Sequence, residues 1–117
     1  MKKIVIIEDD VDTLDMIEII LEENGFAVVR ATRMEPIAEV ISIDPNLMIL
    51  DIVPPYGFGS DLCLEIKNNP KSSLIPVILY SASHNLKKFS KDCLADAYLE
   101  KPFDLDQLLE IVRETIL

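Results

Sequence analysis

The chain has 117 residues, about the size of a single domain, and half of them are hydrophobic, which argues against a disordered chain. Its formal net charge of −10 argues against direct binding to nucleic acid, because that function needs a basic surface. The apolar runs are too short to cross a membrane and no signal peptide opens the chain, so we expect one cytoplasmic domain over residues 1–117 without membrane association.

Five stretches rich in apolar residues predict β-strands, because they are short, often β-branched and bounded by turn residues. They cover residues 3–7, 26–31, 47–51, 74–80 and 97–100. Between them, apolar residues recur at helical spacing in residues 11–23, 36–43, 61–69, 86–95 and 105–116, most weakly in residues 86–95. The predicted caps are Asn24-Gly25 after the first helix, Ser60 or Asp61 before the third, and Asp104 with Gln107 before the last.

Strands that alternate with helices predict an α/β fold with a doubly wound parallel sheet, because right-handed crossovers place helices on both faces. For five strands and five helices, the expected strand order is 2-1-3-4-5. In this order the carboxyl ends of the first and third strands lie side by side, at the edge where such folds place their sites. The residues at these ends are Glu8 and Asp9 after the first strand and Asp51 at the end of the third.

The residue types at this edge indicate phosphoryl chemistry. Carboxylates in one crevice repel one another unless a cation lies between them, and oxygen ligands suit Mg²⁺, which leaves room for a phosphate group. No His or Cys lies at these strand ends, so zinc is not expected. Ser81 after the fourth strand and Lys101 after the fifth add a hydroxyl and an ammonium group. In such a cavity Asp51, the central acid, is the expected covalent acceptor of a phosphoryl group.

Through the motifs Glu8-Asp9, Leu50-Asp51, Ser81-Ala82 and Lys101-Pro102-Phe103, the chain resembles the response regulator receiver domain of two-component signalling. The resemblance covers essentially the whole chain. It implies a flavodoxin-like fold and a phosphorylation switch in a single-domain regulator or phosphorelay protein. The phosphoryl donor would be a phosphohistidine on a histidine kinase or a histidine phosphotransferase.

The resemblance also implies a role for each residue of the site. Asp51 would be the phospho-acceptor, and Lys101 would pair with the phosphoryl group. Asp9, Asp51 and the Val53 carbonyl would bind Mg²⁺ directly, and Glu8 would act through a water.

Two further residues would transmit the phosphorylated state. Ser81 would hydrogen-bond the phosphoryl group, and Tyr98 would be an aromatic switch, with an ordinary half-buried strand aromatic as the alternative. An output protein would read the face built from the fourth helix, fifth strand and fifth helix. The segment between Ser81 and Lys101 is shorter than the family usually has, so the fourth helix is expected to be short, shifted or mobile.

Two other functions remain as alternatives. A receiver fold can act as a phosphorylation-independent docking module, which the loss of an acid or the lysine would favour, but all of them are present. A Mg²⁺-dependent phosphatase would need a second acid two residues after its nucleophile, where this chain has Val53. We therefore expect no enzyme beyond self-phosphorylation and slow self-dephosphorylation. Output through protein contact is expected, unless the chain is a fragment of a larger regulator.

Overall fold

The computed structural model describes residues 1–8, 10–31, 37–51, 58–81, 88, 90, 91, 93–101 and 103–116, and only the backbone of residues 37, 58–61 and 81. The elements in these residues are, in chain order, β1 (Lys3–Ile7), α1 (Val11–Glu23), β2 (Ala27–Ala31), α2 (Ile37–Ser42), β3 (Leu47–Asp51), α3 (Phe58–Asn68), β4 (Val77–Ser81), β5 (Ala97–Glu100) and α5 (Leu105–Thr115). Among them, no helix has both the length and the apolar character that a membrane span requires.

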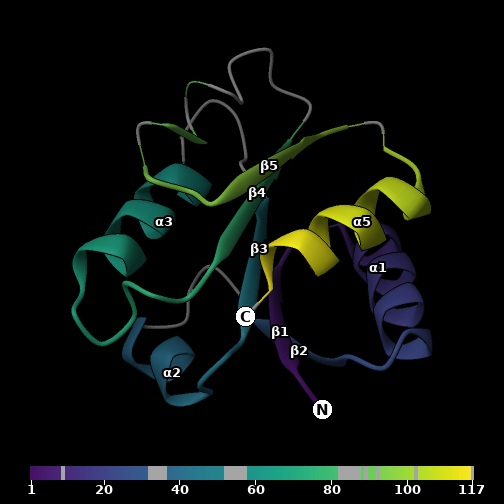
Figure 1. Cartoon of the computed structure of the whole chain (residues 1–117), viewed down its shortest axis with the longest axis horizontal. Helices are drawn as coiled ribbons and strands as arrows, with labels where there is room; N and C mark the ends of the chain where they lie inside the picture. Colours follow the sequence, from purple (N-terminus) through teal and green to yellow (C-terminus); the bar gives the residue numbers. More distant parts are fainter. Residues whose placement is uncertain are drawn as a thin grey trace.

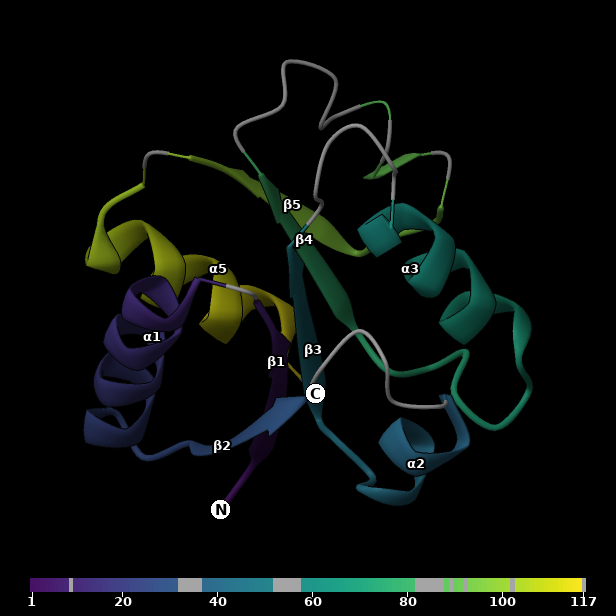
Figure 2. The same cartoon turned by 180° about the vertical axis from the view of Figure 1, so that it is seen from behind.

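The five strands form one parallel sheet in the order β2-β1-β3-β4-β5, as predicted (Figures 1 and 2). β3 lies in the middle, where Ile49 pairs with Ile6 of β1 and with Ile78 of β4. The first four residues of β3 are buried, which confirms a strand covered on both faces. Because the strands are parallel, their carboxyl ends lie at the same edge of the sheet.

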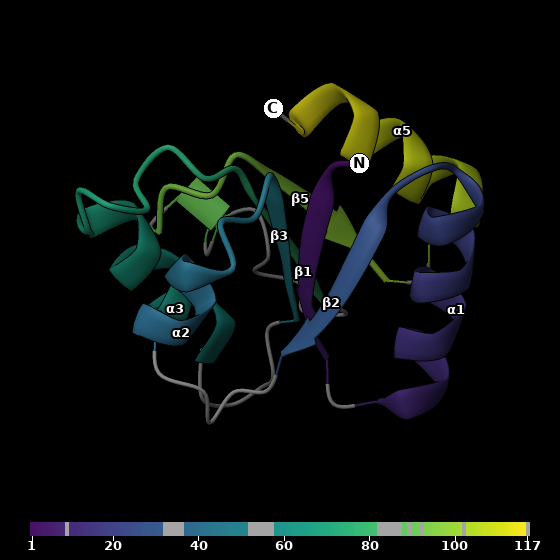
Figure 3. The same ribbon diagram turned by 90° about the horizontal axis from the view of Figure 1, so that it is seen from below.

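Helices cover both faces of the sheet, α1 and α5 on one and α2 and α3 on the other (Figures 1 and 3). The core is divided in the same way, because successive side chains of a strand point to opposite faces. Ile4 and Ile6 of β1 belong to the apolar cluster beneath α1 and α5, whereas Val5 and Ile7 belong to the cluster beneath α2 and α3. The predicted doubly wound α/β fold is therefore confirmed.

The described residues contain four helices, so the prediction of five is wrong for this part of the chain. The difference lies in residues 86–95, where residues 88, 90 and 91 are helical and residues 93 and 94 form a turn. Leu94 has a positive φ of 66°, which no regular α-helix accommodates. The deviation falls in the segment whose helical periodicity is weakest.

The start of α3 also differs from its prediction. The helix begins at Phe58, so Ser60 and Asp61 lie in its first turn instead of capping it. The first N–H groups of a helix have no partner inside the helix, so polar residues are tolerated in that turn as well as at the cap.

β4 begins at Val77, three residues later than predicted. Leu74 lies outside the strand with 84% of its surface exposed. Pro76 has no N–H to give to the sheet, but its carbonyl accepts the Met48 N–H at 2.9 Å. The ladder therefore begins at the proline carbonyl, and the proline interrupts no strand hydrogen bond.

Two predicted helix ends are confirmed. After α1, Gly25 has a φ of +89°, the left-handed conformation that ends a helix. Before α5, the Asp104 side chain accepts the Gln107 N–H at 2.8 Å, and the Gln107 side chain accepts the Asp104 N–H at 3.0 Å. This reciprocal pair is the capping box that the sequence predicts.

Replacing Asp104 by Ala is expected to lower the free energy of unfolding by about 1 kcal/mol, because it leaves an N–H group of α5 without a partner. Urea unfolding followed by circular dichroism measures the change. Asp106→Ala is the matched control, since Asp106 lies in the first turn of the same helix and is exposed. Equal losses for the two variants would contradict a stabilising role for the capping box.

Candidate functional site

Four side chains meet at the carboxyl edge of the sheet, on the face that α1 and α5 cover: Glu8, Asp51, Tyr80 and Lys101. Asp51 pairs in register with Tyr80, and Ile7 pairs with Leu50, so Glu8 follows beside Asp51. Lys101 comes directly after β5. Each of the four lies two positions after a strand residue in the core beneath α1 and α5, namely Ile6, Ile49, Ile78 and Leu99. The two-residue period of the strands thus directs all four side chains to one side of the sheet.

Glu8 is a buried carboxylate whose side chain is only 2% exposed. Its Oε2 accepts the Tyr80 hydroxyl at 2.5 Å. Its Oε1 accepts the Asp10 backbone N–H at 3.3 Å and lies 3.8 Å from the Lys101 Nζ. A buried charge is costly unless it is paired and hydrogen-bonded, and both oxygens of Glu8 satisfy this condition.

Asp51 and Lys101 form the second contact of the site, with 3.3 Å between Oδ1 and Nζ. The Lys101 Nζ also lies 4.7 Å from the centroid of the Tyr80 ring, within the range of a cation–π interaction. One ammonium group therefore faces two carboxylates, Asp51 and Glu8, and the described residues leave the site with an excess of negative charge.

The protonation of Asp51 depends on its burial and on the charges around it. Burial, and next the hydrogen bond and charge of Glu8, raise the pKa of Asp51 from 3.8 to about 6, while Lys101 acts in the opposite direction. At neutral pH the carboxylate is still mostly ionised. The burial of the carboxylate and the neighbouring Glu8 together outweigh the effect of Lys101 on this pKa.

In the absence of metal, Asp51 should lower the free energy of unfolding as the pH rises from about 4 to about 6. The reason is that the Asp51 carboxyl binds its proton more tightly in the folded state than in the unfolded state. The contribution is fully present below the unfolded pKa of 3.8 and is lost above the folded pKa of about 6. Because Asp51 is partly exposed to water, we expect this contribution to the free energy of unfolding to be about 1–2 kcal/mol.

Urea unfolding of the wild type and Asp51→Asn in a chelator, over a series of pH values, isolates this contribution. The stability of the variant relative to the wild type should increase across that pH interval and then level off. A constant difference between the two proteins would contradict the raised pKa.

Two of the four predicted Mg²⁺ ligands, Glu8 and Asp51, are brought together, whereas Asp9 and Val53 lie outside the described residues. Within the described part of the chain, no group of three or more His, Cys, Asp or Glu side chains could hold a metal ion. The oxygen-only donors and the raised pKa of Asp51 nevertheless fit a hard divalent cation, which would offset the charge that Lys101 leaves.

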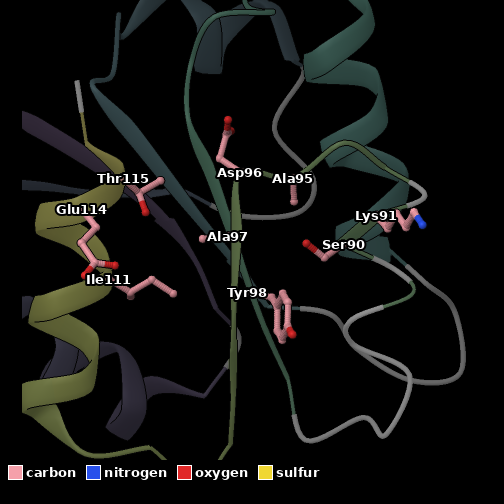
Figure 4. Close-up of a pocket in the computed structure, with 9 residues that line it drawn as sticks. All are labelled: Ser90, Lys91, Ala95, Asp96, Ala97, Tyr98, Ile111, Glu114 and Thr115. Carbon is pink, nitrogen blue, oxygen red and sulfur yellow. The ribbon is translucent and has the colours of Figure 1, made fainter.

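Of the two predicted switch residues, Ser81 lies at the edge of the site and Tyr98 lies outside it. Ser81 ends β4 at the same edge, and only its backbone is described. Tyr98 of β5 is 36% exposed and lines an open pocket with Ser90 and Lys91. Figure 4 shows the Tyr98 ring pointing away from α5, opposite to the neighbouring Ala97. Tyr98 thus lies on the other face of β5 from the Asp51 site.

Tyr80 is a member of the site that was not predicted, because in the sequence it belongs to an apolar run typical of a buried strand. The signal that could have identified it is the alternation within β4. Ile78 and Tyr80 point to the same face, and Tyr80 is the last such residue before the carboxyl edge, so its hydroxyl reaches the acids at that edge.

A five-stranded parallel sheet with an acidic site and a lysine at its carboxyl edge is the arrangement that the resemblance to receiver domains implies. The sequence profile of the response regulator receiver domain matches residues 4–113. The chain therefore belongs to this family of two-component signalling proteins. Response regulators interact with histidine kinases and output proteins, and their receiver domains generally bind Mg²⁺ at an acidic pocket.

Individual relatives agree with this assignment. The chain is 32% identical to the DNA-binding dual master transcriptional regulator RpaA of Synechocystis sp. over 97% of its own length but only 48% of the relative's. It thus spans about half the length of that regulator. It is 30% identical to protein PilG of Pseudomonas aeruginosa, covering 95% of this chain and 84% of PilG.

Solved structures agree as well. A CheY-like response regulator receiver domain protein from Methanospirillum hungatei superposes with a TM-score of 0.84 at 32% identity, covering 97% of this chain and 92% of that one. A chemotaxis protein CheY4 of Vibrio cholerae superposes with a TM-score of 0.87 at 21% identity, covering 99% of both chains, and supports the fold alone.

Proposed function

We propose that this chain is a phosphorylation-dependent signalling switch that accepts a phosphoryl group on Asp51. The observation that carries the proposal is the meeting of Asp51 with Lys101, 3.3 Å apart, beside the buried Glu8. These three residues come from the ends of three strands of a receiver-domain sheet. They supply an acceptor, a cation for phosphoryl oxygens and a second acid.

The phosphoryl donor in this proposal is a phosphohistidine on a histidine kinase or a histidine phosphotransferase. A carboxylate oxygen of Asp51 attacks the phosphorus atom, and the P–N bond to the imidazole breaks. The imidazole nitrogen leaves with the electron pair and takes up a proton, so the products are an aspartyl phosphate and a neutral histidine. Lys101 pairs with the phosphoryl oxygens as negative charge develops on them.

Glu8, Asp9, Asp51 and the Val53 carbonyl are the residues that would hold Mg²⁺. When bound, the ion supplies positive charge against the phosphoryl oxygens. The geometry of Glu8 supports this role, because both of its oxygens are fixed by contacts with Tyr80, Asp10 and Lys101.

In the proposed switch, the phosphoryl group draws Ser81 and Tyr98 inward and biases an equilibrium between two states. The exposed position of Tyr98 is consistent with the state without a phosphoryl group. An output protein would read the face beside it, which residues 90 and 91, β5 and α5 form (Figure 4). The net charge of −10 favours a protein partner over nucleic acid.

Incubation with a small-molecule phosphodonor and Mg²⁺, followed by intact-mass measurement and peptide mapping, tests the proposal. One phosphoryl group should be added, on Asp51, and a chelator should prevent its addition. An unmodified protein that also fails to bind Mg²⁺ would instead favour the phosphorylation-independent docking module.

A further inference from the structure

The hydrogen bond between Tyr80 and Glu8 joins two of the most buried polar side chains at the site. Tyr80 is 1% exposed and the Glu8 side chain 2% exposed, and 2.5 Å separates the phenol oxygen from the Glu8 Oε2. A buried carboxylate loses its hydration and needs donors in its place. The bond to Tyr80 is shorter than the contacts of Glu8 with the Asp10 N–H and the Lys101 Nζ.

The two oxygens of Glu8 have different surroundings. Oε2 accepts the Tyr80 hydroxyl, whereas Oε1 accepts the Asp10 N–H at 3.3 Å and lies 3.8 Å from the Lys101 ammonium, which in turn contacts Asp51. A fixed donor on Oε2 therefore leaves Oε1 as the oxygen that faces the reacting end of the site.

The ring of Tyr80 is itself held in place. Phe103 packs edge-on against it, with 6.0 Å between the ring centroids and 82° between the planes. The Lys101 Nζ lies 4.7 Å from the centroid of the same ring. Tyr80 thus contacts the acid Glu8 through its hydroxyl and the base Lys101 through its ring.

We propose that Tyr80 is a positioning residue for metal-dependent phosphoryl transfer, whose hydroxyl holds Glu8 with Oε1 directed towards the cation site. The inference rests on the proposed function, and goes beyond it in assigning a role to a residue that is neither a ligand nor an acceptor. A correctly held carboxylate oxygen strengthens the binding of a divalent cation, because ligands that are already oriented lose less freedom on binding.

The test variant is Tyr80→Phe, which removes the hydroxyl and keeps the ring that contacts Lys101. Titration with Mg²⁺ alone, followed by the amide signals in NMR spectra, should show an affinity about tenfold weaker than that of the wild type, as the loss of a hydrogen bond to a charged group predicts. In phosphorylation by a small-molecule phosphodonor, the half-saturating Mg²⁺ concentration should rise by a similar factor. The rate at saturating Mg²⁺ should change less than about twofold.

Glu8→Gln and the double variant complete the experiment. If Tyr80 acts through Glu8, adding Tyr80→Phe to Glu8→Gln should change the Mg²⁺ affinity less than about twofold. Thermal unfolding of each variant verifies that it is folded. Glu8→Gln provides a second measurement of the same pathway, because it should weaken Mg²⁺ binding by itself.

The outcomes separate the two proposals. A wild type that neither binds Mg²⁺ nor gains a phosphoryl group would overturn the proposed function. A wild type that does both, together with an unchanged affinity in Tyr80→Phe, would overturn only the role of Tyr80. An effect of Tyr80→Phe that is equally large in the Glu8→Gln background would also overturn it, since the tyrosine would then act by another route.

Discussion

Asp51→Asn should abolish the incorporation of a phosphoryl group while leaving the protein folded. The amide of asparagine lacks the anionic oxygen that attacks phosphorus in the proposed reaction. The fold should persist, because Asp51 follows four buried residues of β3 and the substitution removes a carboxylate whose pKa is raised by burial and by Glu8. Intact-mass measurement after treatment with a phosphodonor and Mg²⁺ detects the loss.

Asp44→Asn is the matched control for this experiment. Asp44 is exposed and has a φ of 55°, a conformation that asparagine adopts readily, and it precedes β3 instead of ending it. This variant should gain one phosphoryl group at the wild-type rate. Continued modification of Asp51→Asn to the wild-type extent would show that another residue is the acceptor.

Lys101→Gln should slow phosphorylation by about 100-fold at saturating Mg²⁺, the size of effect that follows loss of one group stabilising a developing negative charge. The glutamine can still donate a hydrogen bond but carries no charge. It also removes the ion pair with Asp51, so the acids repel one another more strongly. The initial rate of mass gain with a small-molecule phosphodonor measures the effect.

Lys88→Gln makes the same chemical change at an exposed position. Its rate should remain within about twofold of the wild type, since a solvated surface charge contributes little. Equal rates for Lys101→Gln and the wild type would exclude Lys101 from the proposed mechanism. A stronger dependence of the rate on Mg²⁺ in Lys101→Gln would support the proposal that Lys101 and the cation together offset the negative charge of the site.

The sheet could be predicted because its signals are local. The apolar run of β3 ends at Asp51 and that of β1 ends before Glu8, so both acids are placed at the carboxyl edge once the strands are known to be parallel. The capping box at Asp104 is another local signal, confined to four consecutive residues. These features depend on contacts within one element or on its repeat.

The errors arose where contacts from outside a segment decide its conformation. Leu74 has the apolar character of a strand residue, yet the hydrogen bonds of the sheet begin only at the Pro76 carbonyl. The segment of residues 86–95 contains Leu94 in a left-handed conformation, which could not be predicted because this conformation is typical of glycine and not of leucine. A helical or strand pattern shows what a segment can form, but its neighbours decide where the element starts and whether it continues.

The parallel sheet and the meeting of Glu8, Asp51 and Lys101 at one edge follow from the sequence, since strands alternating with helices imply a parallel sheet and 2-1-3-4-5 is the common order for five strands. The contacts among these side chains could not be predicted in the same way, because they depend on the packing of several strands. Tyr80 and Glu8 are 72 residues apart, and their hydrogen bond exists because β1, β3 and β4 pack in a register that brings a phenol beneath a buried acid. Such a contact depends on the relative position of three strands, which no local pattern in any one of them encodes.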